Sequence, residues 1–227
     1  MGSNNDISLK ALAKINLGLD VVRRREDGYH EVRMIMQTIH LYDRLDIKRT
    51  KEPGIQIQTN LSFLPVNENN LIYKAAKLLM DEFSITDGVS VKLDKRIPVA
   101  AGMAGGSTDA AAMLIGVNRL FSLGLTKREL MERGVQIGAD VPYCIMRGTA
   151  LAEGIGEALS PLPPMVKCPV LIAKPSISVS TKFVYQNLKL DDTTIHPDID
   201  RLIDDIKAKN LHDIAAHMGN VLETVTI

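Results

Sequence analysis

Residues 98–112, which read PVAAGMAGGSTDAAA, constrain the fold more than any other stretch of this chain. Alternating apolar residues precede them over residues 88–97 and an alanine-rich segment follows, so the pattern predicts a strand, a tight loop and a helix. Gly102, Gly105 and Gly106 let the backbone approach a ligand closely, and residues 107–109 are typical helix N-caps. A helix N-terminus presents unpaired N–H groups and the positive end of its dipole. We therefore expect an anion, most simply a phosphate group, at this loop.

Composition and charge indicate a globular protein and disfavour several classes of partner. The 227 residues are 45% hydrophobic, and 27 Lys and Arg balance 27 Asp and Glu, so no global positive field recruits nucleic acid or an anionic membrane. No segment approaches the roughly 20 apolar residues of a membrane span. Cys144 and Cys168 lack the spacing of a zinc site or a disulfide scaffold. We expect a cytoplasmic protein without a protein-held metal site.

Apolar periodicity predicts strands early in the chain and helices afterwards. Two short strands are expected within residues 7–22, separated by Ala13 and Lys14, and the later ones are expected over 34–41, 44–50, 55–59 and 88–97. Asn70 should cap a helix whose core stripe is residues 71, 75, 78, 79 and 83, and Thr126 with Glu129 forms a capping box. Beyond a proline-rich loop at 153–164, which we take as a domain boundary, we expect a strand at 168–174 and helices at 178–188, 197–211 and 212–226.

Three places carry side chains suited to chemistry. Lys14 and Asn16 share the face of their strand that is opposite to the apolar one. Tyr29 and His30 follow an Asp-Gly turn, where an aromatic ring and an imidazole can stack on and hydrogen-bond a heterocycle. Asp140 lies between a glycine and a Val-Pro pair just past a helix end, on a connection that fixes its orientation.

The motifs together point to a family. A Walker A sequence is absent, and Gly154-Ile155-Gly156 lacks the third glycine of the dinucleotide fingerprint. The combination of PVAAGMAGGS, AKINL and GADVP resembles the GHMP small-molecule kinases. Within that family, AKINL followed by REDGYH is similar to the members that act on 4-diphosphocytidyl-2-C-methyl-D-erythritol. The resemblance runs from about residue 11 to the end of the sequence.

The resemblance implies an α+β, two-domain GHMP kinase fold. Residues 1–163 would form the N-terminal ATP-binding domain and residues 164–227 the C-terminal domain. The family pattern continues past the last residue given, so we expect this second domain to be incomplete. The implied reaction is the ATP-dependent phosphorylation of a substrate hydroxyl in the non-mevalonate pathway of isoprenoid biosynthesis, with Mg²⁺ bridging the phosphates.

The resemblance also assigns roles to residues. Asp140 would accept the hydroxyl proton, and Lys14 would keep that carboxylate ionised. The substrate, which carries a cytidine diphosphate group, would contact Asn16, Tyr29, His30 and Tyr185. The ATP-binding residues would be Asn70, Pro98, Val99, Ala100, Ala101, Gly102, Met103, Ala104, Gly105, Gly106 and Ser107. Some relatives carry glycine at the positions of Ala100 and Ala101, a conservative difference if neither backbone is left-handed.

Three alternatives stay open at this stage. The chain could phosphorylate another small alcohol such as mevalonate, phosphomevalonate or homoserine, none of which carries a cytosine for Tyr29, His30 and Tyr185 to bind. It could be a nucleotide-binding fragment without turnover, in which ligand raises the melting temperature but no chemistry follows. It could also be an α+β domain whose glycine turn is structural.

Overall fold

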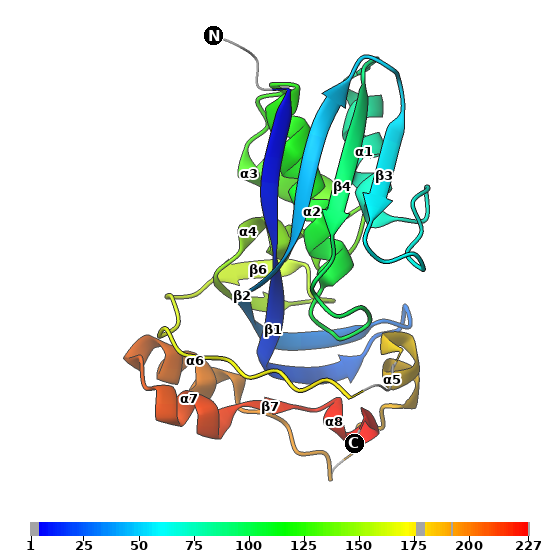
Figure 1. The fold of residues 1–227 in the computed structure, drawn as a ribbon. Coiled ribbons are helices and arrows are strands. Elements are labelled where there is room, and N and C mark those ends of the chain that lie inside the picture. The colour runs from blue at the N-terminus through cyan, green and yellow to red at the C-terminus, as the bar shows by residue number, and fades with distance from the viewer. Residues whose placement is uncertain (1–4, 176–179, 192, 227) are drawn as a thin grey trace. The chain divides into compact units, whose positions relative to one another are not determined.

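The computed structural model describes residues 5–175, 180–191 and 193–226 of the chain. Seven strands and eight helices fall within these residues (Figure 1). In chain order they are β1 (Asp6–Arg24), β2 (His30–Thr50), β3 (Ile55–Thr59), α1 (Leu71–Glu82), β4 (Gly88–Asp94), α2 (Gly105–Leu120), α3 (Lys127–Gly134), α4 (Val141–Met146), β5 (Thr149–Glu153), β6 (Ala158–Pro161), α5 (Thr181–Asn187), α6 (Ile199–Ala208), α7 (Leu211–His217), β7 (Gly219–Asn220) and α8 (Glu223–Thr226).

The chain divides into two compact units, each assembled from separate segments. Unit 1 contains the described residues up to Ala13, His40–Val99 and Met103–Met146. Unit 2 contains Lys14–Ile39, Ala100–Gly102 and the described residues from Arg147 onward. Both β1 and β2 therefore contribute one part to each unit. The domain boundary that the sequence indicates near residue 164 stays a prediction.

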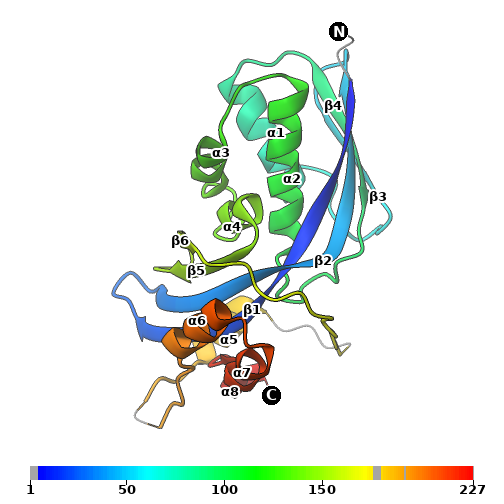
Figure 2. The same cartoon turned by 90° about the vertical axis from the view of Figure 1, so that its left-hand side faces the viewer.

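The sheet of unit 1 has the strand order β3-β4-β2-β1. Strand β4 runs antiparallel to β2, from Arg44 opposite Asp94 to Thr50 opposite Gly88, and parallel to β3. Val89, Val91 and Leu93 are buried, which confirms the alternation expected for this strand. Figure 2 shows α1, α2, α3 and α4 on one face of this sheet. The strands thus bury one side chain in two beneath the helices.

Local sequence signals set the helix ends in unit 1. The Asn70 side chain accepts the Ile72 N–H at 2.9 Å and so caps α1, as predicted. Thr126 and Glu129 form the expected capping box at the start of α3. The predicted stripe on α1 is confirmed at Ala75 and Leu79 but wrong at Phe83, which is exposed, and the other buried residues are Ile72, Ala76 and Met80. Both patterns recur at helical spacing because this helix is apolar over a wide arc.

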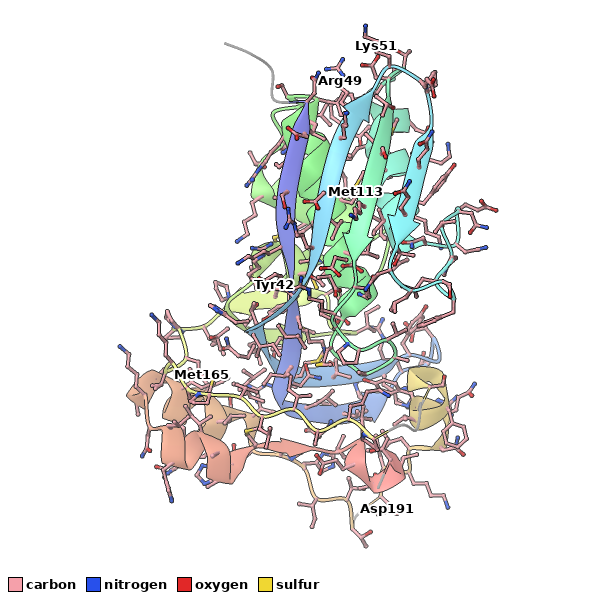
Figure 3. All side chains as sticks on the ribbon, in the orientation of Figure 1. Tyr42, Arg49, Lys51, Met113, Met165 and Asp191 are labelled. Atoms are coloured by element: carbon pink, nitrogen blue, oxygen red, sulfur yellow. The ribbon has the colours of Figure 1, made fainter. Side chains whose placement is uncertain are left out.

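The face of the sheet away from the helices carries polar and aromatic side chains. Tyr42 of β2 has the opposite parity to the buried Asp43 and Leu45. The Lys10 ammonium lies 4.5 Å from the centroid of the Tyr42 ring, and the Arg96 guanidinium lies 5.9 Å from it. Figure 3 labels Tyr42 on β2 and Met113 on α2, and Met113 is fully buried. The Tyr42 ring therefore makes cation–π contacts on this side of the sheet.

Unit 2 has its own strand pairs and its own core. Strand β5 runs antiparallel to β2 and β6, while Gly18 and Leu19 of β1 pair in parallel with β7. The apolar face of α6 packs against the strands, and the buried cluster consists of Leu17, Ile35, Ile199, Leu202, Ile203, Ile206 and Ile214. The Arg33 guanidinium joins β2 to α6 through Asp200 at 2.6 and 2.8 Å. This cluster fixes the part of β1 that carries Lys14 and Asn16.

Several sequence predictions of local structure were wrong. Strands β1 and β2 are each continuous, over 19 and 21 residues, because the polar residues inside them still pair in the sheet. Residues 168–174 form no strand, and Leu171 is 97% exposed. The helix expected over 212–226 is interrupted by β7, where Gly219 meets β1. The start predicted near Ser178 lies outside the described residues, and the helix observed next in the chain is α5, Thr181–Asn187.

A mixed sheet with helices packed on it is the α+β arrangement that the sequence predicts. Its central feature for function is the connection from β4 to α2. The strand ends at Asp94 and the helix begins at Gly105, so the glycine-rich residues form the link between them. Strand, loop and helix thus follow one another in the expected order.

Candidate functional site

The glycine-rich loop ends at a sharp helix start. The N-cap of α2 is Ala104, with a left-handed backbone (φ 54°), and its carbonyl accepts the Thr108 N–H at 2.8 Å. The first turn of a helix leaves its N–H groups without intrahelical partners, and here these belong to Gly105, Gly106 and Ser107. The prediction that residues 107–109 cap the helix was wrong, because Gly105 and Gly106 are already helical. The three free donors still suit an anion.

The loop holds two alanines in a conformation that favours glycine. Ala100 and Ala104 both have φ near 54°, and Gly102 has φ 69°. The sequence comparison treated Ala100 and Ala101 as conservative replacements on the condition that neither was left-handed, and that condition fails for Ala100. A left-handed alanine costs about 1–2 kcal/mol. The loop therefore stores backbone strain beside the predicted phosphate site.

Ala100→Gly should relieve this strain, whereas Ala101→Gly should not. Both changes lower stability by about 0.4–1 kcal/mol through the entropy of the unfolded chain, but only the first removes a left-handed alanine. We expect Ala100→Gly to be more stable than Ala101→Gly by about 1–2 kcal/mol. Urea unfolding of the two variants and the unaltered protein measures this difference. Equal destabilisation by both substitutions would contradict the left-handed assignment.

Asp140 lies on the short connection between α3 and α4. It is half-buried, and its main-chain carbonyl accepts the Cys144 N–H at 3.0 Å, which starts α4. Its carboxylate has no hydrogen-bond partner among the residues that the structure describes. Gly138, two residues earlier, faces the first turn of α2, since a Cβ on it would lie 4.0 Å from Ser107 Oγ. Unit 1 thus brings the Asp140 connection beside the N-terminus of α2.

Lys14 and Asn16 lie together on β1 in unit 2. The Lys14 side chain is almost fully buried, with a residue exposure of 6%, and its Nζ donates to Asn16 Oδ1 at 3.1 Å. The two residues share one face of the strand, as the sequence parity indicates. The amide oxygen therefore orients the ammonium group.

His30 and Tyr185 form an aromatic pair in unit 2. Their ring centroids are 5.1 Å apart and their planes are tilted by 37°. Burial lowers the pKa of His30 and the positive charge of Arg24 adds to the effect, so the imidazole is neutral at pH 7. A neutral imidazole offers one N–H donor and one acceptor. The structure thus brings together two predicted substrate residues that are far apart in sequence.

Tyr29 lies on the turn directly before His30. Its side chain is 60% exposed, and its N–H donates to Asp27 Oδ1 at 3.1 Å within the turn. Gly28 supplies the left-handed residue of the turn, with φ 85°. Tyr29 therefore sits on an exposed turn next to the His30–Tyr185 pair.

Asn70, predicted to lie near the nucleotide, has a structural task at the start of α1. Its Oδ1 accepts from Ile72, and its Nδ2 donates to the Pro65 carbonyl at 2.7 Å. Gly106 of α2 approaches this helix start, since a Cβ on it would lie 3.4 Å from Leu71 Cδ1. The first residues of α1 and α2 are therefore neighbours in unit 1, and the role of Asn70 toward nucleotide stays a prediction.

Sequence reasoning missed a buried group of ionisable side chains formed by Asp43, Lys95 and Asp109. Lys95 Nζ donates to Asp109 Oδ2 at 2.7 Å and also to Asp43 Oδ2. Burial raises the pKa of Asp109 to about 8, Lys95 opposes that shift, and the charge on Asp43 adds to it. Only Asp109 carried a signal in the sequence, as a charged residue in an alanine-rich helix, and the sequence analysis interpreted it as a cap.

The raised pKa of Asp109 predicts a pH-dependent stability. Its ordinary value is 3.8 and its folded value is about 8, so between these values the folded protein keeps a proton that the unfolded chain has released. The contribution of Asp109 to the free energy of unfolding is fully present below about pH 4. It is lost as the pH rises to about 8, by up to about 1.4 kcal/mol per pH unit. Asp109→Asn should gain stability over the unaltered protein across that window. Urea unfolding at pH 5 to 9 measures the difference. If the free energies of unfolding of the two proteins changed with pH in parallel, this would contradict the raised pKa of Asp109.

Two kinds of feature are absent from the described residues. They contain no helix long and apolar enough to cross a lipid bilayer, and no group of three or more His, Cys, Asp or Glu side chains arranged to hold a metal ion. A surface cavity of about 200 Å³ between the β3 edge and α1, lined by residues such as Tyr73 and Lys77, contains none of the predicted site residues. The candidate residues are therefore Asp140 and the start of α2 in unit 1 and, taken separately, Lys14, Asn16 and the His30–Tyr185 pair in unit 2.

The chain resembles known proteins in sequence and in fold. Residues 70–148 match the family described as GHMP kinases N terminal domain. A curated protein of Lachnoclostridium phytofermentans, named 4-diphosphocytidyl-2-C-methyl-D-erythritol kinase, is 61% identical over 221 residues, which are 97% of this chain and 76% of that protein.

Solved structures extend this likeness. A crystal structure of 4-(cytidine 5'-diphospho)-2C-methyl-D-erythritol kinase superposes with a TM-score of 0.77 and 31% identity, covering 96% of this chain and 76% of that one. A homoserine kinase from Cytophaga hutchinsonii superposes with a TM-score of 0.72 over 97% of this chain and 73% of that one. At 16% identity, this second likeness concerns the fold alone.

Proposed function

The chain belongs to the 4-diphosphocytidyl-2-C-methyl-D-erythritol kinases of the GHMP kinase family, and on that premise we propose how its residues divide the work of phosphoryl transfer. The family reaction is the ATP-dependent phosphorylation of a small molecule in the non-mevalonate pathway of isoprenoid biosynthesis, and the substrate carries a cytidine diphosphate group. The protein is thus a small-molecule kinase with the GHMP fold. The residue roles below, a cytoplasmic location and the domains 1–163 and 164–227 are our proposals.

We propose that the loop of residues 98–107 holds the ATP phosphates. The observation that carries this proposal is the start of α2, where Gly105, Gly106 and Ser107 present N–H groups beside the Asp140 connection. The loop contains no carboxylate, so its donors fit phosphate oxygens directly. Mg²⁺, when bound, would neutralise charge on the phosphates and reach the site with them.

Asp140 is the proposed general base. Its carboxylate has no protein hydrogen-bond partner within the described residues, so it is available to accept the proton of the substrate hydroxyl. That oxygen attacks the γ-phosphorus, the bond from this phosphorus to the bridging oxygen breaks, and ADP leaves. Lys14, oriented by Asn16 at 3.1 Å, would stabilise the negative charge of this step.

The His30–Tyr185 pair is the proposed anchor for cytosine. Two rings at 5.1 Å leave no room for a base between them, which needs about 7 Å. Tyr29 is exposed, so we propose that the base stacks between Tyr29 and Tyr185. His30, kept neutral, then offers its donor and acceptor to the base edge.

The reaction of the protein with several alcohols tests this proposal. Release of ADP is followed with 4-diphosphocytidyl-2-C-methyl-D-erythritol, mevalonate or homoserine, with ATP alone as the blank. We expect turnover with the cytidyl substrate and rates at the blank level with the other two. Turnover with another alcohol would contradict the role of His30 and Tyr185. Nucleotide binding without turnover of any acceptor would favour a nucleotide-binding module instead.

A further inference from the structure

Three buried side chains that take no part in the proposed chemistry lie beside the two ends of the glycine-rich loop. Asp43 comes from β2, Lys95 follows β4, and Asp109 lies on α2, each with a side chain at most 4% exposed. Lys95 Nζ bridges the two carboxyl groups. Buried ionisable groups are costly unless they are paired, so this bridge favours one arrangement of the three elements.

Asp43 binds the backbone of the residues that directly precede the loop. Its Oδ1 accepts the main-chain N–H of Arg96 at 2.5 Å and of Ile97 at 2.7 Å. Ile97 directly precedes Pro98, the first residue of the loop, and its side chain is buried. One carboxyl group thus fixes the backbone at the entrance while it also accepts from Lys95.

Asp109 links Lys95 to the helix that follows the loop. It lies one turn after the start of α2 at Gly105, and its Oδ2 accepts from Lys95. Its Oδ1 is buried without a partner among the described residues. The Lys95 side chain therefore connects the loop entrance to the helix on which the loop ends.

The Lys95 ammonium group lies very close to Gly105, the first residue of α2. A Cβ at this position would lie 2.8 Å from Lys95 Nζ and 3.2 Å from Ile97 Cγ2. The ammonium group thus lies against the first residue of α2, where the proposed phosphate-binding N–H groups begin. Because Lys95 is buried, it cannot bind nucleotide itself and can act only through the position of that backbone.

We infer that Asp43, Lys95 and Asp109 form a clamp across the two ends of the glycine-rich loop, and that Lys95 is a positioning residue for the ATP phosphates. The inference rests on the proposed function, because it takes the loop as the ATP site. A misplacement of about 1 Å can cost about 100-fold in rate. Partial release of the clamp should accordingly weaken ATP binding by about tenfold.

Lys95→Met tests the clamp through two separate substrates. We expect the KM for ATP to rise about tenfold, while the KM for the cytidyl substrate changes by less than about twofold. Calorimetric titration with a non-hydrolysable ATP analogue gives the affinity independently of turnover. Lys92→Met, an exposed lysine of β4, is the matched control and should leave both values unchanged.

A double variant separates positioning from stability. Lys95→Met alone leaves Asp43 buried without its cation, which destabilises the protein. Adding Asp43→Asn removes that charge, and the amide oxygen can still accept from Arg96 and Ile97. We expect the melting temperature to recover while the affinity for the ATP analogue stays about tenfold weaker, because the link to α2 is still broken.

The outcomes distinguish this inference from the proposed function. A double variant with unaltered affinity for the ATP analogue, or equal increases in both KM values, would overturn the clamp. If the unaltered protein binds the analogue but phosphorylates no acceptor, the proposed function fails, and the affinity comparison still decides the clamp. If the unaltered protein does not bind the analogue, both fail.

Discussion

Asp140→Asn should reduce kcat by a factor of about 10² to 10⁴ and leave nucleotide affinity unchanged. Asparagine has the same shape as aspartate but cannot take a proton from the substrate hydroxyl. The carboxylate has no protein partner in the described part of the chain, so the exchange breaks no hydrogen bond there and should not unfold the site. Single-turnover kinetics with ATP and the cytidyl substrate, together with calorimetry of nucleotide binding, measure the two effects.

A matched control for this prediction is Asp81→Asn. Asp81 lies on the surface of α1 in an exposed ion pair with Lys77, and an exposed pair contributes little to stability. This variant should keep the kcat of the unaltered protein. If Asp140→Asn lowered kcat by less than about tenfold, the proton would have to leave by another route, and Asp140 would not be the base.

Tyr185→Ala should raise the KM for the cytidyl substrate by a factor of about 5 to 150 and leave the KM for ATP unchanged. Stacking of a base on an aromatic side chain contributes about 1–3 kcal/mol, and this variant removes one stacking surface and the ring that contacts His30. Initial rates at varied concentrations of each substrate separate the two constants. Tyr185→Phe, which retains the ring, should stay close to the unaltered protein.

Phe183→Ala provides the control on the same helix. Phe183 lies two residues earlier on α5 with 54% of its surface exposed, so its loss tests whether any aromatic deletion on α5 has the same effect. We expect both KM values to remain unchanged in this variant. If Tyr185→Ala raised the KM for ATP to a similar extent, Tyr185 would have a general structural role rather than a role in binding cytosine.

The sequence predicted the elements whose patterns are local. The cap at Asn70, the capping box at Thr126 and the alternation in β4 are decided by neighbouring residues, and the structure shows all of them. The strand, loop and helix order around Gly105 was likewise readable, because glycines mark the loop and alanines mark the helix. These signals were sufficient to locate the loop.

The predictions of strand and helix extent that failed concern contacts between distant segments. The pattern treated Ala13 and Lys14 as a break, yet β1 passes through them as one strand, since pairing with neighbours overrides a polar residue. The break at β7 depends on Gly219 meeting Gly18, 201 positions away, which no local period encodes. Residues 168–174 are apolar enough for a strand but pair with no partner strand within the described residues.

In the candidate site, too, the sequence indicates individual residues but not the contacts between distant segments. His30 and Tyr185 were both named from the family resemblance, but their contact at 5.1 Å needed the fold. Asp43 and Lys95 carry no local sign of burial, because each stands among ordinary charged residues. Their link to Asp109 appears only when β2, β4 and α2 are assembled.

Phosphorus NMR of the complete reaction tests the central claim most directly. The protein is mixed with ATP, Mg²⁺ and 4-diphosphocytidyl-2-C-methyl-D-erythritol, and the phosphorus signals are followed with time. The account predicts one new phosphomonoester signal on the methylerythritol part, with one ADP formed for each substrate consumed and the diphosphate bridge intact. ADP accompanied only by inorganic phosphate, or a substrate that stays unchanged while ATP is bound, would contradict it.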